Sequence, residues 1–278
     1  MSSKGFLIFA QGEEYLRQAY ALALSIKITQ PIHNSVSVVT SNQMPEKYKN
    51  IFDNIIPIPW DDEAKDSEWK IENRWKLIYT SPYDETIVLD SDMLFFKDIT
   101  PVWDHISKYD LFFANKVLDY KGRVIEDGVN RRAFIKNNLP NIYFGLHYFK
   151  KNDTTFNFYK MLELVVHNWQ AFYGEFSSLE YQNWLSMDVS AAIAVKVLGL
   201  EDDVVDNSID FSFVHMKPNV QGWSPAPNSW IDSSLHYFTI DMNLFINQIK
   251  QEGIFHYTEN HFLTDDIIKT LEFNHVGE

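Results

Sequence analysis

Short apolar runs alternate with stretches of helical spacing along the first part of the chain. Gly5–Ala10 is typical of a short buried strand, and Ser35–Thr40, Asn54–Ile58 and Glu85–Leu89 are further strand-like runs. Apolar residues recur every three or four positions over Glu13–Ile28, which predicts a helix, and Lys47–Phe52 predicts a shorter one. Strands that alternate with helices in this order are typical of parallel βαβ units. The pattern therefore predicts an α/β fold with a doubly wound, mostly parallel sheet.

The second half has a less regular pattern. Further strand-like runs are Leu111–Ala114, Ile142–Phe149, Ile209–His215, Trp230–Phe238 and Glu252–Tyr257. Helical spacing is found over Arg74–Tyr79, Pro101–Tyr109, Thr154–Ala171, Met187–Leu198 and Thr264–Glu272. Between these elements, Asn115–Pro140 is polar and contains glycines, which predicts a loop or a lid. No repeat or clear linker divides the chain, so we expect a single domain over residues 1–278.

Composition narrows the classes of function. The 278 residues carry a formal net charge of −14, and such a surface repels phosphate backbones at long range. A bulk nucleic-acid partner would therefore require a local basic patch. The chain has no cysteine, which excludes disulfides, thiolate zinc sites and cysteine nucleophiles. No apolar run is typical of a signal peptide or a membrane span, so we expect a cytoplasmic protein.

Two carboxylates interrupt an otherwise apolar stretch at Asp90 and Asp92. They follow the predicted strand Glu85–Leu89, and apolar residues resume directly after them. In an extended chain these two side chains project to the same side, and ligands of parallel sheets bind beyond the carboxyl ends of the strands. Two neighbouring carboxylates repel each other unless a cation neutralises them, and Mg²⁺ or Mn²⁺ suits carboxylate oxygens. The alternative is two solvated acids in a loop, which the apolar flanks disfavour.

The same residues carry a resemblance to a known family. The stretch YDETIVLDSDMLFFKDITPVWD resembles the Asp-x-Asp segment of GT-A fold glycosyltransferases, and is most similar to the glycogenin and lipopolysaccharide galactosyltransferase group. The preceding RWKLIYTSPYDE resembles the helix before that motif. The resemblance covers roughly the first 115 residues and is patchy afterwards. It implies a Rossmann-like GT-A fold with helices on both faces, in which residues 1–115 bind a nucleotide-sugar and residues 116–278 bind the acceptor.

The resemblance also implies roles for the first half of the site. Asp90 and Asp92 would hold Mn²⁺ or Mg²⁺ against the diphosphate of a nucleoside-diphosphate sugar, with a UDP-sugar favoured, and Ser91 would lie near the ribose. The turn after the first strand would supply residues of the base and ribose pocket, and two basic residues would lie near phosphate. Ala10 and Gln11 are the residues of the turn, and Arg74 and Lys76 are the two basic residues near phosphate. The alternative for the basic pair is surface charge on an amphipathic helix.

A third metal ligand in the family is a histidine near the C-terminus. His256 in GIFHYTENHF matches it in position and in the residues that follow directly. His215 in FVHMKPNVQGW is the second candidate, with Lys217 a phosphate contact, although it falls early in the chain. We favour His256 and expect His215 to be a pocket residue. A lone histidine is more often structural than a ligand, so both remain hypotheses.

Two further segments resemble the donor-sugar region of the family. NIYFGLHYF places Gly145 near the sugar, and LSMDVSAAI places Asp188 at the second acid of an Asp-Gln-Asp segment. Ser186 and Met187 stand where the family has the first acid and the glutamine, which leaves open whether the reaction retains or inverts configuration. Asp188 would be the general base of an inverting reaction, or a helix N-cap.

These observations predict a metal-dependent glycosyltransferase that moves a hexose or pentose from a nucleotide-sugar to an acceptor hydroxyl of a saccharide or protein. One alternative is a nucleotidyltransferase, which Gly12 followed by two acids disfavours. Another is a non-catalytic carbohydrate-binding protein, which would not hydrolyse a nucleotide-sugar. Trp223 and Trp230 are either sugar platforms or core residues. A hydroxymethylated DNA base as acceptor would require a basic rim from Lys116, Lys121, Arg123, Arg131 and Arg132.

Overall fold

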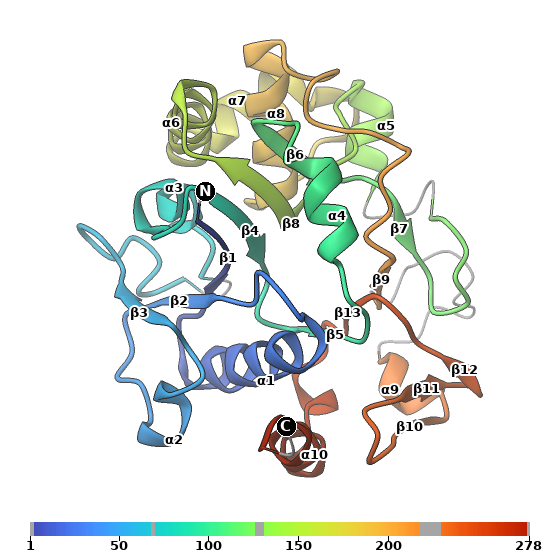
Figure 1. The fold of residues 1–278 in the computed structure, drawn as a ribbon. Coiled ribbons are helices and arrows are strands. Elements are labelled where there is room, and N and C mark those ends of the chain that lie inside the picture. The colour runs from blue at the N-terminus through green and yellow to red at the C-terminus, as the bar shows by residue number, and fades with distance from the viewer. Residues whose placement is uncertain (1–2, 68–69, 126–130, 217–228, 277–278) are drawn as a thin grey trace.

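A six-stranded sheet forms the centre of the protein. The computed structural model describes residues 3–67, 70–125, 131–216 and 229–276 (Figure 1). The strand order is β3-β2-β1-β4-β8-β6. The strands are β1 (Lys4–Phe9), β2 (Val36–Thr40), β3 (Asn54–Pro57), β4 (Glu85–Leu89), β6 (Leu111–Ala114) and β8 (Tyr143–Lys150). The first four run parallel, whereas β8 lies antiparallel between β4 and β6. The predicted mostly parallel sheet is confirmed.

Helices cover both faces of this sheet, as the alternation of buried residues along β1 requires. Phe6 and Ile8 belong to one buried cluster with the apolar residues of α1 (Glu13–Thr29). Leu7 and Phe9 belong to a second cluster with α6 (Asp153–His167) and α8 (Met187–Leu198). Figure 1 shows α6 and α8 on one side of the sheet and α1 on the other. Successive strand residues point to opposite faces, so one apolar run supplies both cores.

A second, four-stranded sheet joins distant parts of the chain in the order β5-β13-β9-β7. Its strands are β5 (Met93–Phe95), β7 (Val117–Leu118), β9 (Phe213–His215) and β13 (Ile254–His256). Strand β13 pairs antiparallel with β5 and parallel with β9. The remaining strands, β10 (His236–Phe238), β11 (Leu244–Ile246) and β12 (Ile249–Lys250), form a three-stranded sheet. The four-stranded sheet sets the segment after β4 beside two segments of the C-terminal half.

The other helices have at most 8 residues, except the last one, which has 12. They are α2 (Glu46–Lys49), η1 (Arg74–Lys76), α3 (Leu77–Thr80), α4 (Thr100–Ile106), α5 (Arg132–Asn137), α7 (Trp169–Phe176), η3 (Ser178–Glu180), α9 (Trp230–Ser233), η4 (Asn260–Phe262) and α10 (Asp265–Val276). Among the described residues, none of the helices combines the length and apolar character required to cross a bilayer.

Three element predictions were wrong in ways the structure explains. The expected helix Thr154–Ala171 is two helices, because Asn168 leaves helical geometry with φ −125° and ψ 29°. The expected strand Trp230–Phe238 begins as helix α9, whose N-cap is the Ser229 side chain. The expected loop or lid Asn115–Pro140 contains β7 and α5, while residues 126–130 lie outside the described part.

Candidate functional site

The two acids of the Asp-Ser-Asp segment lie where β4 leaves the sheet. Asp90 and Asp92 both line one cavity, and their side chains are 20% and 21% exposed. Ser91 lies between them and is buried, with its hydroxyl donating to Gln18 Oε1 on α1 at 2.9 Å. The predicted convergence of the two carboxylates is therefore observed. The ribose contact expected of Ser91 stays a prediction.

His256 reaches these acids because β13 pairs with β5 directly after them. His256 lies opposite Met93, and its Nε2 is 2.9 Å from Asp92 Oδ1. Asp90, Asp92 and His256 each offer one ligand atom, and these atoms all lie within 4.8 Å of one another. Burial opposes the charged form of Asp92, but His256, a backbone hydrogen bond and Arg74 together outweigh burial and lower the pKa of the Asp92 carboxyl.

His215 lies next to His256 on the adjacent strand and is not part of the cluster with the acids. The two histidines are register partners on β9 and β13, with ring centroids 4.3 Å apart. His215 is buried and packs against the Tyr143 ring. Among the described residues, the group of acids and histidines that could hold a metal comprises Asp90, Asp92 and His256. The structure thus brings together three of the four predicted ligands, and it places His215 on the neighbouring strand, outside this group.

Arg74 and Lys76 have different surroundings although they are two positions apart. The Arg74 guanidinium forms an ion pair with Asp90, and its pKa is raised because the two aspartates outweigh the effect of burial. Lys76 is fully buried, and its ammonium donates to Asn73 Oδ1 at 2.8 Å and pairs with Glu63 at 3.2 Å. Neither residue is a surface charge, so that alternative was wrong. Only Arg74 of the two lines the cavity.

Gly145 lies against the first acid. Its carbonyl oxygen accepts a hydrogen bond from the Asp90 N–H at 2.9 Å, as β8 passes beside β4. A Cβ added at Gly145 would overlap the Asp90 carboxylate. A side chain at this position would therefore displace Asp90, and the close approach explains why glycine stands here.

Asp188 occupies the first turn of α8 and lines the same cavity. Its Oδ1 accepts from the Phe144 N–H at 2.8 Å, and its Oδ2 pairs with Arg131 at 2.9 Å. The N-cap of α8 is Ser186, so the N-cap prediction for Asp188 was wrong. Arg131 is only 4% exposed, and its guanidinium stacks on the Tyr143 ring at 3.4 Å. This buried network fixes the carboxylate beside the cavity.

The turn after β1 forms a buried polar network. The Gln11 amide donates to Asp62 at 2.8 Å, and its oxygen accepts from Asn73 at 2.9 Å. Ala10 is fully buried. Gly12 has φ 110°, a conformation that glycine adopts without strain, and it turns the chain into α1. Neither Ala10 nor Gln11 lines the cavity next to the acids, so their nucleotide contacts stay a prediction.

Four further predictions concern residues away from the acids. Lys217 and Trp223 lie outside the described residues. Trp230 is a core residue, 1% exposed, with its indole N–H donating to Tyr257 O at 2.7 Å, so it is not a sugar platform. The basic rim is not formed as expected, because Lys116, Arg123 and Arg131 each pair with a carboxylate at 2.6 to 3.0 Å. DNA as the acceptor loses its main support.

The cavity has a volume of about 720 Å³ and includes residues that sequence reasoning missed. Tyr15 lines it from the first turn of α1, and burial raises the pKa of its hydroxyl. Trp184 lines it from the segment before α8 and is 57% exposed. The position of Tyr15 directly after the first strand and turn was a usable signal. No comparable signal in the sequence pointed to Trp184, because an aromatic residue in an irregular segment is equally compatible with core packing.

The three clustered residues fit a divalent cation. They provide two carboxylates and one imidazole, a mixed oxygen and nitrogen set that suits Mn²⁺. His256 Nδ1 is buried without a hydrogen-bond partner among the described residues, whereas its Nε2 faces Asp92 Oδ1 at 2.9 Å. Arg74 already compensates one of the two negative charges. The site can therefore hold a cation and remain partly open on its cavity side.

Comparison with solved structures identifies the fold. No protein-family model and no curated protein sequence matches the chain. The galactosyltransferase LgtC, in complex with donor and acceptor sugar analogs, has a TM-score of 0.56 at 15% identity, over 97% of this chain and 95% of that one. The bifunctional glycosyltransferase WbbM has a TM-score of 0.50 at 15% identity, over 97% of this chain and 50% of that one. The architecture is that of the GT-A glycosyltransferases.

Proposed function

We propose that this protein is a metal-dependent glycosyltransferase that moves a sugar from a nucleoside-diphosphate sugar to an acceptor hydroxyl. The observation that carries the proposal is the cluster of Asp90, Asp92 and His256 at the carboxyl edge of β4, facing a cavity of about 720 Å³. Ligands of open α/β sheets bind at this edge. The GT-A architecture agrees with a donor of this class.

The residues that line the first cavity suggest separate roles in binding the donor. Asp90, Asp92 and His256 would hold Mn²⁺ or Mg²⁺, which when bound stabilises negative charge on the leaving diphosphate. Arg74 lies beside Asp90 and lines the cavity, so it can turn toward a phosphate oxygen once a cation neutralises Asp90. Tyr15 offers an aromatic face and a hydroxyl to the nucleotide. A uridine nucleotide is the favoured donor.

Asp188 is better placed to orient the donor sugar than to remove a proton. Both of its carboxylate oxygens already accept a hydrogen bond or ion pair, from the Phe144 N–H and from Arg131. These contacts hold the carboxylate in a fixed orientation beside the cavity. A sugar hydroxyl can still donate to the free lone pairs. Gly145 lies directly against the Asp90 carboxylate and lines the same cavity.

The two alternatives receive less support. A nucleotidyltransferase requires free backbone N–H groups in a phosphate loop after the first strand, but here the Gly12 N–H donates to Asn42 Oδ1 at 2.6 Å. A non-catalytic carbohydrate-binding protein has no need of an open metal site. It would bind sugars and yet leave a nucleotide-sugar intact, so hydrolysis of the donor separates the two functions.

The test is release of UDP from UDP-galactose and UDP-glucose in the presence of Mn²⁺, with and without a chelator. Asp92→Asn should reduce release by at least about 100-fold, because it removes a charged metal ligand. Mutation of a residue that only hydrogen-bonds a metal ligand already lowers metal affinity or activity by up to about 100-fold. Asp104→Asn, at an exposed position on α4, is the matched control and should retain full activity. Chelator-resistant release, or full activity in Asp92→Asn, would contradict the metal assignment. Binding without hydrolysis would favour the carbohydrate-binding alternative.

A further inference from the structure

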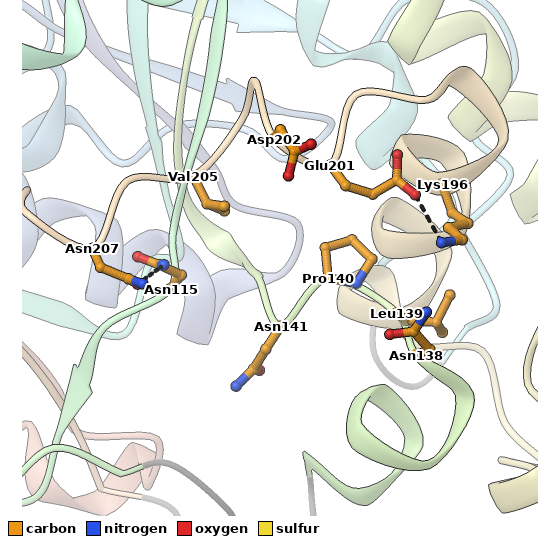
Figure 2. A pocket seen from close by; sticks show the side chains of 10 residues that line it. All are labelled: Asn115, Asn138, Leu139, Pro140, Asn141, Lys196, Glu201, Asp202, Val205 and Asn207. Atoms are coloured by element: carbon orange, nitrogen blue, oxygen red, sulfur yellow. Dashed lines mark hydrogen bonds and ion pairs between the residues drawn. The ribbon is translucent and has the colours of Figure 1, made fainter.

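A second cavity, of about 560 Å³, opens between the end of β6, the segment before β8 and the loop after α8 (Figure 2). The residues that line it are Asn115, Asn138, Leu139, Pro140, Asn141, Lys196, Glu201, Asp202, Val205 and Asn207. None of them belongs to the candidate metal site. Four are asparagines, and each amide side chain both donates and accepts hydrogen bonds.

The charges in this cavity disfavour an anionic ligand. Lys196 is paired with Glu201 at 2.9 Å, and Figure 2 shows this pair at one end of the cavity. Asp202 adds a negative charge that no cation of the lining balances. A phosphate or carboxylate would therefore meet net repulsion. Leu139, Pro140 and Val205 add apolar surface between the polar groups, which is a suitable lining for a neutral ligand with both hydroxyl and C–H faces.

Asn141 provides the most specific indication of a ligand. Its Oδ1 is buried and has no hydrogen-bond partner among the described residues. A buried acceptor without a partner is destabilising, so such a group in a cavity wall calls for a donor from a ligand or from water. Asn115 and Asn207, in contrast, are hydrogen-bonded to each other at 2.7 Å (Figure 2). A hydroxyl-rich ligand supplies the donor that Asn141 lacks.

The second cavity shares two structural elements with the first. Asn141 lies just before β8, and Gly145 on β8 faces Asp90 in the first cavity. Helix α8 has Asp188 in its first turn at the first cavity and Lys196 in its last turn at the second. Because β6 and β4 run in the same direction, their carboxyl ends open at the same edge of the sheet.

We propose that the second cavity is a carbohydrate subsite that holds a neutral, hydroxyl-rich part of the acceptor glycan, remote from the hydroxyl that receives the sugar. This inference rests on the proposed glycosyltransferase function, since it assigns an oligosaccharide as the acceptor. Binding at a remote subsite adds affinity for a long acceptor, and it positions the reactive end. A short acceptor reaches the first cavity alone and gains nothing from the second.

The experiment that tests this subsite measures glycan binding by the full chain without nucleotide or metal. It uses an array of neutral and anionic oligosaccharides that includes maltotetraose and chitotetraose. Wild-type protein should retain neutral glycans, and Asn141→Ala and Asp202→Ala should each reduce that binding by about tenfold, the effect of a lost hydrogen bond. Asn141 Oδ1 has no partner to lose and Asp202 is exposed, so both variants should fold. Asn50→Ala, at an exposed position on α2's C-cap, is the control.

The outcomes separate this inference from the proposed function. No retained neutral glycan, retention of anionic glycans only, or wild-type binding by both variants would overturn the subsite. Asp92→Asn should bind glycans as wild type does while it loses donor hydrolysis. If wild-type protein binds glycans through Asn141 but never hydrolyses a donor, the subsite stands and the transferase function fails. If donors are hydrolysed while Asn141→Ala leaves glycan binding unchanged, the function stands and the subsite fails.

Discussion

His147 makes the stability of the sheet beside the site dependent on pH. It lies on β8, two positions after Gly145, and is fully buried. Its Nδ1 is 2.6 Å from Phe144 O, which can only accept, so Nδ1 carries the proton. Its Nε2 lies 2.6 Å from the Tyr159 hydroxyl and accepts from it. Both contacts suit the neutral ring, and burial lowers the pKa of His147 from 6.5 to about 4.

The sign of the effect follows from the two pKa values. Between pH 6.5 and about 4 the unfolded chain binds a proton at this position and the folded protein does not. The free energy of unfolding therefore falls as the pH falls through this window, and the contribution is fully present only above pH 6.5. At about 1.4 kcal/mol for each pKa unit, the complete loss is about 3 kcal/mol. Between pH 7 and pH 5 the loss is about 2 kcal/mol.

Urea unfolding at pH 7 and pH 5 measures this loss for wild-type protein and for His147→Gln. The variant cannot take up a proton, so its free energy of unfolding should fall by about 2 kcal/mol less than that of the wild type over the same step. His105→Gln, at an exposed position on α4, should keep the wild-type difference. Equal pH dependence in wild type and His147→Gln would refute the assignment of a neutral, buried imidazole.

Two further predictions concern the metal site, and titration with Mn²⁺ measures both. Gly145→Ala should weaken Mn²⁺ binding at least about tenfold, because the new Cβ would overlap the Asp90 carboxylate, whereas Gly174→Ala, with open space around it, should not. Comparable affinities in these two variants would mean that the site tolerates movement of the acid. His256→Ala should weaken Mn²⁺ binding more than His215→Ala, since only His256 joins the cluster. The opposite order would make His215 the ligand.

The hydrophobic pattern was sufficient to predict the central sheet. Runs such as that over Glu85–Leu89 are buried along their whole length, and the structure places the strand over the same residues. The pattern also showed that Asp90 and Asp92 end a buried strand, which is enough to predict that they converge at a ligand-binding edge. These features are local, because they depend on the period of the hydrophobic pattern and on residues close to it in the sequence.

Tertiary structure decided which distant residues complete the site. The family resemblance favoured His256 over His215, but the apolar pattern does not separate them, since each ends a short apolar run. The pairing of β13 with β5 is what sets His256 beside Asp92. Arg74 and Lys76 are likewise indistinguishable by pattern, yet one pairs with Asp90 and the other is enclosed by Asn73 and Glu63.

The physical reason is that strand pairing and burial of charge depend on the whole fold. A period of two or of 3.6 residues determines which side of an element is apolar, and the sequence carries this information directly. Which strand lies next to another depends on the packing of segments far apart in the chain, as β5 and β13 illustrate. The sequence by itself thus determined the sheet and the two acids. The tertiary structure decided which histidine joins the two acids, which buried residue pairs with Asp188, and where the second cavity lies.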